Sequence, residues 1–163
     1  MRFSVLALAS TLALSGCNLL FGGGGGGGGG GGVTFTQGFT FVRKDDRNVY
    51  LADDADPQTP ETRTQSANVK TPSFSRDGAN IVFVRGGTSD AELAVVSTAA
   101  GGAVRTVLAS TAMMKNFKTP VFSPDGARIA FSYDDGTANT RIGLVNADGT
   151  GVQTLSNGGL AQA

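Results

Sequence analysis

Histidine and tryptophan are absent from this 163-residue chain, and cysteine occurs once. The absence of imidazole removes the usual general base of hydrolytic triads and a common ligand of zinc. A single cysteine excludes a disulfide within the chain. Thirteen basic residues balance thirteen acidic ones, so no net field attracts nucleic acid or an anionic surface. We therefore expect a non-catalytic protein with no cofactor and no nucleic-acid partner.

The first residues have the form of a secretory signal. Arg2 supplies a positive charge, and residues 5–14 are apolar except for Ser10 and Thr11. This run is too short to cross a membrane, which takes about 20 helical residues. It ends in Leu14-Ser15-Gly16-Cys17, which resembles the cleavage site of bacterial lipoprotein signals.

That resemblance implies cleavage between Gly16 and Cys17 and a diacylglycerol anchor on Cys17, with a further acyl chain in many bacteria. Two or three acyl chains anchor a protein firmly in a membrane, because each buried methylene contributes about 0.8 kcal/mol. Enteric lipoproteins that stay at the inner membrane carry Asp directly after the lipidated cysteine. Asn18 stands at that position here, which favours the outer membrane. We expect a protein anchored in the bacterial cell envelope, facing the periplasm or the outside. The alternative for Cys17 is a small buried apolar side chain.

Eleven consecutive glycines, Gly22 to Gly32, follow the cysteine. Glycine loses the most backbone entropy on ordering, so we expect a disordered tether with a span of roughly 17–20 Å. A phosphate-binding loop would need a following Lys-Ser or Lys-Thr pair, which this run lacks. We divide the chain into a signal peptide at 1–16, a lipidated tether at 17–32 and a folded domain at 33–163.

The folded domain contains a repeat. Residues 70–83 recur at 118–131, 48 residues later, with ten of fourteen positions identical. Residues 93–96 then match 142–145, and a weaker copy lies upstream around residues 41–64, without the Thr-Pro-x-Phe-Ser-x-Asp-Gly opening. We place a partial repeat at 33–69 and full repeats at 70–117 and 118–158.

Each full repeat is expected to form four short strands. These are Thr71–Ser75, Ile81–Arg85, Leu93–Ser97 and a strand near Val104 in one copy, and Thr119–Ser123, Ile129–Tyr133, Arg141–Asn146 and a strand near Val152 in the other. The repeated turn is structural, because it suits a type I turn with Gly in fourth place; its residues are Ser75, Asp77 and Gly78, and Ser123, Pro124, Asp125 and Gly126. Short strands at this spacing indicate an all-β fold.

Two apolar runs, residues 81–84 and 93–96, are unbroken, which predicts strands covered on both faces. Four-stranded units of this length that stack face to face are typical of propeller blades. The segment 119–131 resembles the WD40-like repeat of TolB-type periplasmic proteins, Pro-x-Phe-Ser-Pro-Asp-Gly-x-x-Ile-Ala-Phe. The resemblance implies an incomplete β-propeller that binds an envelope protein or serves as a scaffold.

Propellers of this type usually have six or seven blades, whereas this chain offers two and a partial third. Three interpretations remain open: a fragment or remnant of a longer gene, a small open stack, or self-association through open blade faces, in which two chains make six blades. The alternative functions are an accessory propeller of a hydrolase, prolyl-oligopeptidase-like or sugar-degrading, and a non-functional remnant.

Other candidate sites have simpler explanations. The cluster Asp53, Asp54 and Asp56 could bind Ca²⁺ but lacks the Gly and distal Glu of a calcium loop, so we expect a solvated hairpin. Lys115 and Lys118 flank an aromatic residue that could stack a base, and Met113-Met114 could bind a soft metal. Packing between blades explains the methionines as well. The recurring phenylalanines, Phe74, Phe83, Phe122 and Phe131, should be core.

Overall fold

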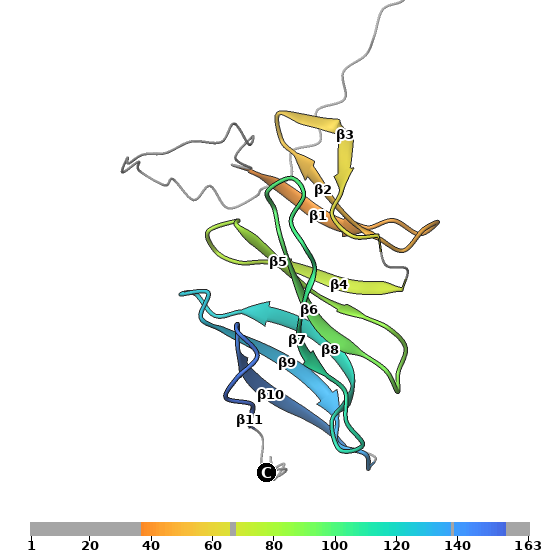
Figure 1. Cartoon of the computed structure of the whole chain (residues 1–163), viewed down its shortest axis with the longest axis vertical. Helices are drawn as coiled ribbons and strands as arrows, with labels where there is room; N and C mark the ends of the chain where they lie inside the picture. Colours follow the sequence, from red (N-terminus) through yellow and green to blue (C-terminus); the bar gives the residue numbers. More distant parts are fainter. Residues whose placement is uncertain (1–36, 66–67, 138, 156–163) are drawn as a thin grey trace, which may run out of the picture. The chain divides into compact units, whose positions relative to one another are not determined.

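A computed structural model describes residues 37–65, 68–137 and 139–155. These residues form three antiparallel sheets, which Figure 1 shows in chain order. The first sheet contains β1 (Gly38–Val42), β2 (Val49–Asp53) and β3 (Asp56–Thr62). The second contains β4 (Val69–Phe74), β5 (Asn80–Arg85), β6 (Glu92–Ser97) and β7 (Arg105–Ala109). The third contains β8 (Lys115–Phe122), β9 (Arg128–Asp134), β10 (Thr140–Asn146) and β11 (Gln153–Thr154).

The expected all-β fold, with two four-stranded units and a partial third, is confirmed. The second and third sheets are simple meanders, each formed by one full repeat, and their registers correspond. Phe83 pairs with Ala94 in the second sheet, and Phe131 pairs with Gly143 in the third. Within the described ranges no helix is long and apolar enough to cross a membrane. The predicted signal peptide, Cys17 and the glycine run lie outside the described residues.

The first sheet corresponds to the last three strands of a full repeat. Its β1 contains Phe41 at the position that Phe83 and Phe131 occupy in the second strand of the other sheets. Among the described residues, β1 therefore forms one edge of its sheet and pairs with β2 alone. The missing opening motif thus corresponds to a missing first strand in the described part of this sheet.

The first strand of each full repeat is longer and less regular than the sequence predicts. The structure begins β4 at Val69 and β8 at Lys115, before the expected starts at Thr71 and Thr119. The pairing register shifts within both strands. Thr71 and Thr119 have φ angles of 47° and 45°, which are rare for β-branched residues. A bulge with an extra residue lets each strand bend and still continue along its partner.

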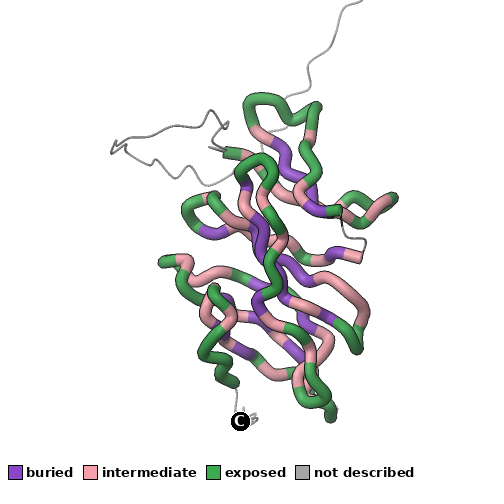
Figure 2. Tube along the Cα trace, viewed as in Figure 1, coloured by how far each residue is buried: buried purple, intermediate pink, exposed green. Residues whose placement is uncertain are grey.

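Two apolar clusters hold the sheets together, one at each junction. The second sheet contributes to both: Ile81 and Phe83 lie in the cluster shared with the first sheet, and Val82 and Val84 lie in the cluster shared with the third. Figure 2 shows the buried stretches running along the strands, with exposed residues concentrated in the hairpins. The second sheet is thus covered on both faces, which explains the unbroken apolar runs in its sequence.

The phenylalanines of the second strands occupy the centres of these clusters. Phe83 and Phe131 are almost fully buried, and Phe117 packs edge-on against Phe131 with ring centroids 5.3 Å apart. Phe74 and Phe122 are partly buried and pack against the cluster margins. Burying one such side chain contributes about 1.5–3 kcal/mol, so the junctions account for much of the stability.

Gly143 provides the space that the Phe131 ring occupies. A Cβ atom at residue 143 would lie 2.5 Å from Cζ of Phe131, well inside van der Waals contact. The ring therefore lies directly over the glycine backbone of the neighbouring strand. The equivalent position in the second sheet, Ala94, is also small and fully buried.

We expect Gly143→Ala to lower the free energy of unfolding by about 1–3 kcal/mol, because the added methyl overpacks the cluster at Phe131. Urea denaturation of the detergent-solubilised full chain, followed by circular dichroism, measures this loss. The double variant Gly143→Ala/Phe131→Leu should lose less than the sum of the two single variants, because the shorter side chain leaves room. Strictly additive losses would contradict the assigned contact.

Candidate functional site

The repeated Ser-x-Asp-Gly segments form the turn that joins the first two strands of each full repeat. In the second sheet the Ser75 hydroxyl donates to the Asp77 carboxylate at 2.6 Å and accepts from the Asn80 N–H at 2.9 Å. The Gly78 N–H closes the turn onto the Ser75 carbonyl at 2.9 Å, with φ of 70° at Gly78. A positive φ suits glycine, which has no Cβ to clash.

The same turn recurs in the third sheet with nearly identical geometry. Ser123 donates to Asp125 at 2.6 Å, and the Gly126 N–H bonds the Ser123 carbonyl at 2.8 Å. Pro124 is exposed between them. The Ser123 hydroxyl and then the Ala127 N–H hold the pKa of Asp125 below its ordinary value of 3.8. Each carboxylate is thus used inside its own turn, which gives these residues a structural role.

The acidic cluster of the first sheet is likewise used locally. Asp53 accepts from the Ala55 N–H at 2.8 Å, and Asp56 accepts from the Thr59 hydroxyl at 2.5 Å. Asp54 is exposed in the same hairpin. No group of three or more acidic, histidine or cysteine side chains that could hold a metal ion occurs in the described part of the chain.

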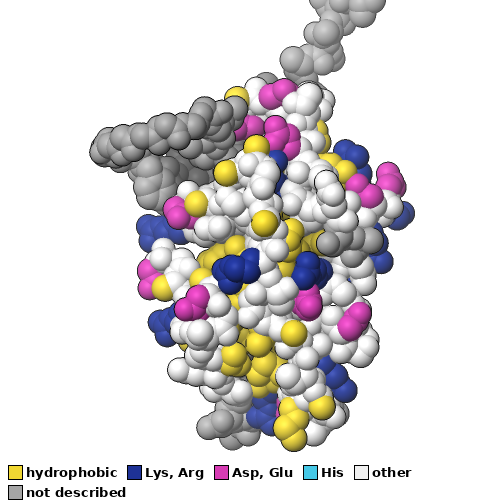
Figure 3. All heavy atoms as spheres, in the orientation of Figure 1, with side chains coloured by type: hydrophobic (Ala, Val, Ile, Leu, Met, Phe, Trp, Pro, Cys, Tyr) yellow, Lys and Arg dark blue, Asp and Glu magenta, His cyan; other side chains and the backbone are white. Residues whose placement is uncertain are grey.

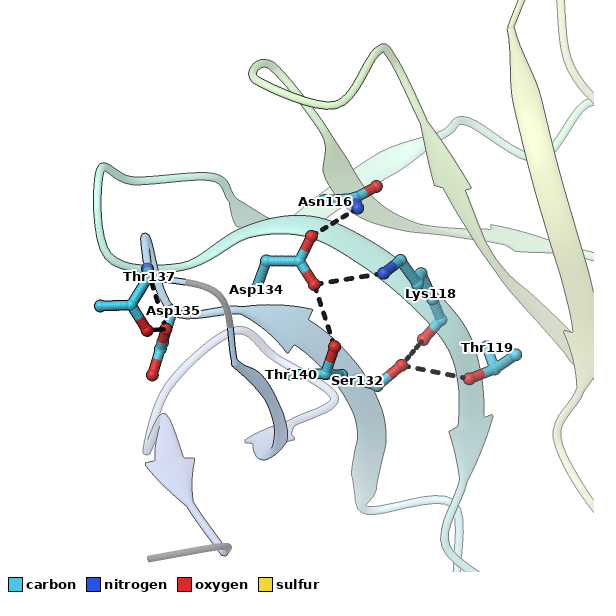
Figure 4. A network of polar contacts seen from close by, with 8 residues as sticks. All are labelled: Asn116, Lys118, Thr119, Ser132, Asp134, Asp135, Thr137 and Thr140. Atoms are coloured by element: carbon cyan, nitrogen blue, oxygen red, sulfur yellow. Dashed lines mark hydrogen bonds and ion pairs between the residues drawn. The ribbon is translucent and has the colours of Figure 1, made fainter. Parts of the chain in front are cut away.

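The basic residues around Phe117 do not form a base-stacking surface. Phe117 is buried in the cluster between the second and third sheets, so its ring is not available to a ligand. Figure 4 shows that Lys118 and Asn116 both point to Asp134, with donor–acceptor distances of 3.1 and 2.6 Å. On the face shown in Figure 3, Lys and Arg side chains lie among Asp and Glu side chains, as the zero net charge suggests.

The Asp134 network fixes the hairpin between β9 and β10. Hydrogen bonds from Asn116, then Lys118, lower the pKa of Asp134. The adjacent Asp135 accepts from the N–H and the hydroxyl of Thr137 and from Arg141 Nε at 2.8 Å. These bonds, led by the Thr137 hydroxyl, lower the pKa of Asp135 from 3.8 to about 2.

The two methionines of the predicted soft-metal pair behave differently. Met114 packs against the cluster between the second and third sheets, as expected for inter-sheet packing. Met113 is 78% exposed in the turn between β7 and β8. The packing explanation therefore applies to Met114 and is wrong for Met113.

A cavity of about 460 Å³ lies beside Arg63, and the sequence did not predict it. Its lining comprises Thr62, Arg63, Thr64, Gln65, Gly101, Gly102 and Val104. Nη2 of Arg63 pairs with Glu61 at 2.6 Å, while Nε of Arg63 is buried without a hydrogen-bond partner among the described residues. The ion pair with Glu61 thus balances the charge of Arg63 beside this cavity.

The third sheet leaves one apolar face exposed, which we call the downstream face. Residues that pair directly across two strands point to the same face of the sheet. Residues that alternate along the strand with the buried Ile129 and Phe131 therefore point away from the second sheet. The downstream face comprises the apolar Val121, Ala130, Ile142, Leu144 and Leu155 together with the polar Ser132 and Gln153. Ile142 is 49% exposed and Leu155 57%. A surface of adjacent exposed apolar side chains is typical of an interaction site.

The first sheet has an aromatic face on its opposite side, which we call the upstream face. It comprises Phe39, Phe41 and Tyr50, whose side chains alternate with those that pack on the second sheet. The Phe41 and Tyr50 rings stack with centroids 5.7 Å apart, and the Arg43 guanidinium lies 4.2 Å from the centroid of Tyr50. Tyr50 is also held by a 2.6 Å hydrogen bond to Asp46, while Phe39 is half exposed.

Comparison with solved structures identifies the architecture. The chain is similar to a putative TolB from Agrobacterium tumefaciens, with 22% identity and a TM-score of 0.58 over 72% of this chain and 43% of that one. TolB from Acinetobacter baumannii matches at 22% identity and a TM-score of 0.57, over 69% of this chain and 27% of that one. A chain of a nidogen–laminin complex matches at 9% identity and a TM-score of 0.58, over 71% of this chain and 43% of that one.

These likenesses show the fold, and the three sheets are the blades of a partial TolB-like β-propeller. The chain spans less than half the length of the solved chains it matches. A scan against protein-family models finds no match, and neither does a search of curated proteins. The lipidation site at Cys17 and the cleavage position at Gly16 lie outside the described residues and stay predictions.

The depressed pKa of Asp135 predicts a pH dependence of stability. Its carboxylate stabilises the fold fully above pH 3.8, and this contribution is lost as the pH falls towards 2. We expect Asp135→Asn to lose less of its unfolding free energy than the parent chain over that acid range.

Carboxyl-carbon NMR titration should give a higher pKa for Asp135 in Thr137→Ala. The matched change Thr150→Ala, beside Asp148, should leave the pKa of Asp135 unchanged. Equal shifts of that pKa in both variants would contradict the role assigned to the Thr137 hydrogen bonds.

Proposed function

We propose that this chain is a lipid-anchored protein of the bacterial cell envelope whose propeller blades bind another protein without catalysis. The observation that carries the binding role is the downstream face, where Val121, Ile142 and Leu155 are each about half exposed on one sheet. An apolar sheet face of this kind gains free energy when another surface covers it. The lipoprotein-like segment ending at Cys17 supports the location.

The chemistry of the described residues fits binding better than turnover. The chain has no histidine, and the carboxylates with lowered pKa, such as Asp77, Asp125 and Asp135, are each held by hydrogen bonds within their own turns. A general acid or base works best with a pKa near the operating pH. A lowered pKa moves a carboxylate away from that range, so these groups suit structural roles.

The fold supports the same role at a coarse level. Propellers present side chains on rigid strands, and the positions of those side chains are set by the packing of neighbouring blades. The chain shares this architecture with TolB from two bacteria. One of the other solved structures with this fold is a complex of two proteins, nidogen and laminin.

The anchor is tested by Cys17→Ala. We expect this variant to lose acyl labelling and to leave the membrane fraction, because the predicted anchor consists of the lipid on that residue. Metabolic labelling with a fatty-acid analogue and fractionation measure both effects. Asn18→Ala, the matched neighbouring change, should keep the label. A Cys17→Ala protein that stays in the membrane fraction would falsify the lipid anchor.

The binding role is tested by photo-cross-linking in intact cells. A photoreactive amino acid at Leu155, on the downstream face, should form adducts with a protein, because that side chain is 57% exposed among apolar neighbours. The control position is Thr59, which is exposed on β3 away from the face. Denaturing gels and mass spectrometry identify the adducts. Equal or absent adducts at both positions would contradict a protein-binding downstream face.

A further inference from the structure

One position in the last strand of the first sheet departs from the repeat. The last strand of each sheet has a threonine that pairs at the same repeat position: Thr62 with Tyr50, Thr106 with Ala94 and Thr154 with Gly143. The residue after this threonine is the apolar Val107 in the second sheet and Leu155 in the third, but Arg63 in the first. Val107 lies in the core cluster between the second and third sheets. The first sheet thus has a guanidinium where the second contributes an apolar side chain to a junction.

The Arg63 side chain is largely buried at the junction between the first and second sheets. Leu51, which packs on the second sheet, pairs with Glu61, so Glu61 and Arg63 both point to that junction. The side chain of Arg63 is 11% exposed, against 64% for that of Glu61. A charged group with a buried donor that lacks a partner, such as Nε of Arg63, costs free energy. Proteins accept such costs most often at functional sites.

The turn that closes the second junction has a counterpart at the first junction that packs less closely. A Cβ atom at Gly149, in the turn between β10 and β11, would lie 2.6 Å from the carbonyl oxygen of Val107. The corresponding residue between β6 and β7 is Gly101, since both glycines lie five positions before the equivalent threonines. A Cβ atom at Gly101 would meet no atom within 4 Å. The cavity beside Arg63, which Gly101 lines, therefore lies where the other junction is closed.

The cavity has the size and the lining of a small-molecule site. Its volume of about 460 Å³ falls within the range of about 300–1,000 Å³ that is usual for ligand pockets. Val104 provides an apolar wall, Thr62 and Gln65 add exposed polar side chains, and two glycines contribute backbone. Arg63 supplies a positive charge. Apolar surface with a few polar groups is the combination that binds and orients a small organic ligand.

The ion pair with Glu61 shows which chemical group the guanidinium accepts. Nε and Nη2 form one edge of an arginine side chain, and that edge can bind both oxygens of a carboxylate. Glu61 engages the edge through Nη2 alone and from an exposed position, and exposed ion pairs contribute little free energy. A carboxylate that replaced Glu61 would keep the charge of Arg63 balanced. After a rotation of the guanidinium it would also give Nε a partner.

From these observations we infer that the cavity between the first and second sheets binds a small organic carboxylate through Arg63. The carboxylate of the ligand takes the place of the Glu61 carboxylate on the guanidinium, and the apolar part of the ligand packs against Val104. Glu61 is thus an internal competitor that holds Arg63 until the ligand replaces it.

This site goes beyond the proposed protein-binding role and does not depend on it. The cavity is lined by residues at the end of β3 and in the turn before β7, whereas the downstream face belongs to the third sheet. A failure of the cross-linking experiment at Leu155 would therefore leave the carboxylate site standing, and the reverse also holds.

NMR titration of the detergent-solubilised full chain with hexanoate tests the site. We expect a saturable shift of the Nε–H resonance of Arg63, which is identified by its loss in Arg63→Gln, because that proton gains a carboxylate acceptor. Hexanamide has the same shape without the charge and should bind roughly 10-fold more weakly, since hydrogen bonds to a charged acceptor are stronger. A shift that does not saturate, or equal affinities for hexanoate and hexanamide, would overturn the inference.

Variants separate the roles of the two charged residues, with the backbone amides of Gly101 and Gly102 as the common readout of hexanoate binding. Arg63→Gln should weaken binding roughly 10-fold or more, whereas Glu61→Gln should strengthen it several-fold, because the competing carboxylate is gone. The matched control is Arg105→Gln, which should bind as the parent does, because Arg105 donates to the Ala147 carbonyl at the other junction. Circular dichroism checks that each variant is folded.

Unchanged affinity in Arg63→Gln would overturn the site. Binding that is unchanged or weaker in Glu61→Gln would overturn the competition with Glu61, and it keeps the inference testable if Arg63→Gln does not fold. Equal losses of affinity in Arg63→Gln and Arg105→Gln would show a general effect of removing an arginine and would likewise contradict a site at Arg63.

Discussion

Packing of one apolar sheet face on the next is the interaction on which the structure depends. A β-strand has two faces, and the second sheet is apolar on both, with Ile81 and Phe83 on one side and Val82 and Val84 on the other. Such a sheet is stable only between two others, because its exposed apolar area would otherwise cost the free energy that burial supplies. The outer sheets satisfy this constraint on one side each. The constraint therefore explains both the order within the stack and the apolar character of its ends.

The elements predicted from the sequence are those that local chemistry and the repeat determine together. The Ser-x-Asp-Gly turns at Ser75 and Ser123 close as expected, since a hydroxyl, an aspartate and a glycine specify a turn without help from distant residues. The all-β class followed from short apolar runs separated by turn signals, and the division into two full repeats and a partial one followed from the 48-residue period. The burial of Phe83 and Phe131 followed from their recurrence in phase.

The features that the sequence did not reveal depend on residues brought together from different strands. The bulges at Thr71 and Thr119 arise from pairing across a register shift, which local propensity does not encode. The interaction of Asp134 with Asn116 and Lys118 joins two strands and has no counterpart in the second sheet, where Gly86 occupies that position. Periodicity could have signalled the burial of Phe117, because Val69 lies 48 residues before it in the same place.

The division of the core into two clusters gives the domain a graded response to local opening. Each outer blade is secured by a single cluster, whereas the middle blade belongs to both, so an outer blade can detach without disrupting the opposite junction. Amide protons of β5 and β6 would then exchange with solvent only when both junctions are lost, and those of β2 or β10 when one is lost. The domain thus behaves as a linear array of three blades, and its slowest-exchanging amide protons lie in the middle blade.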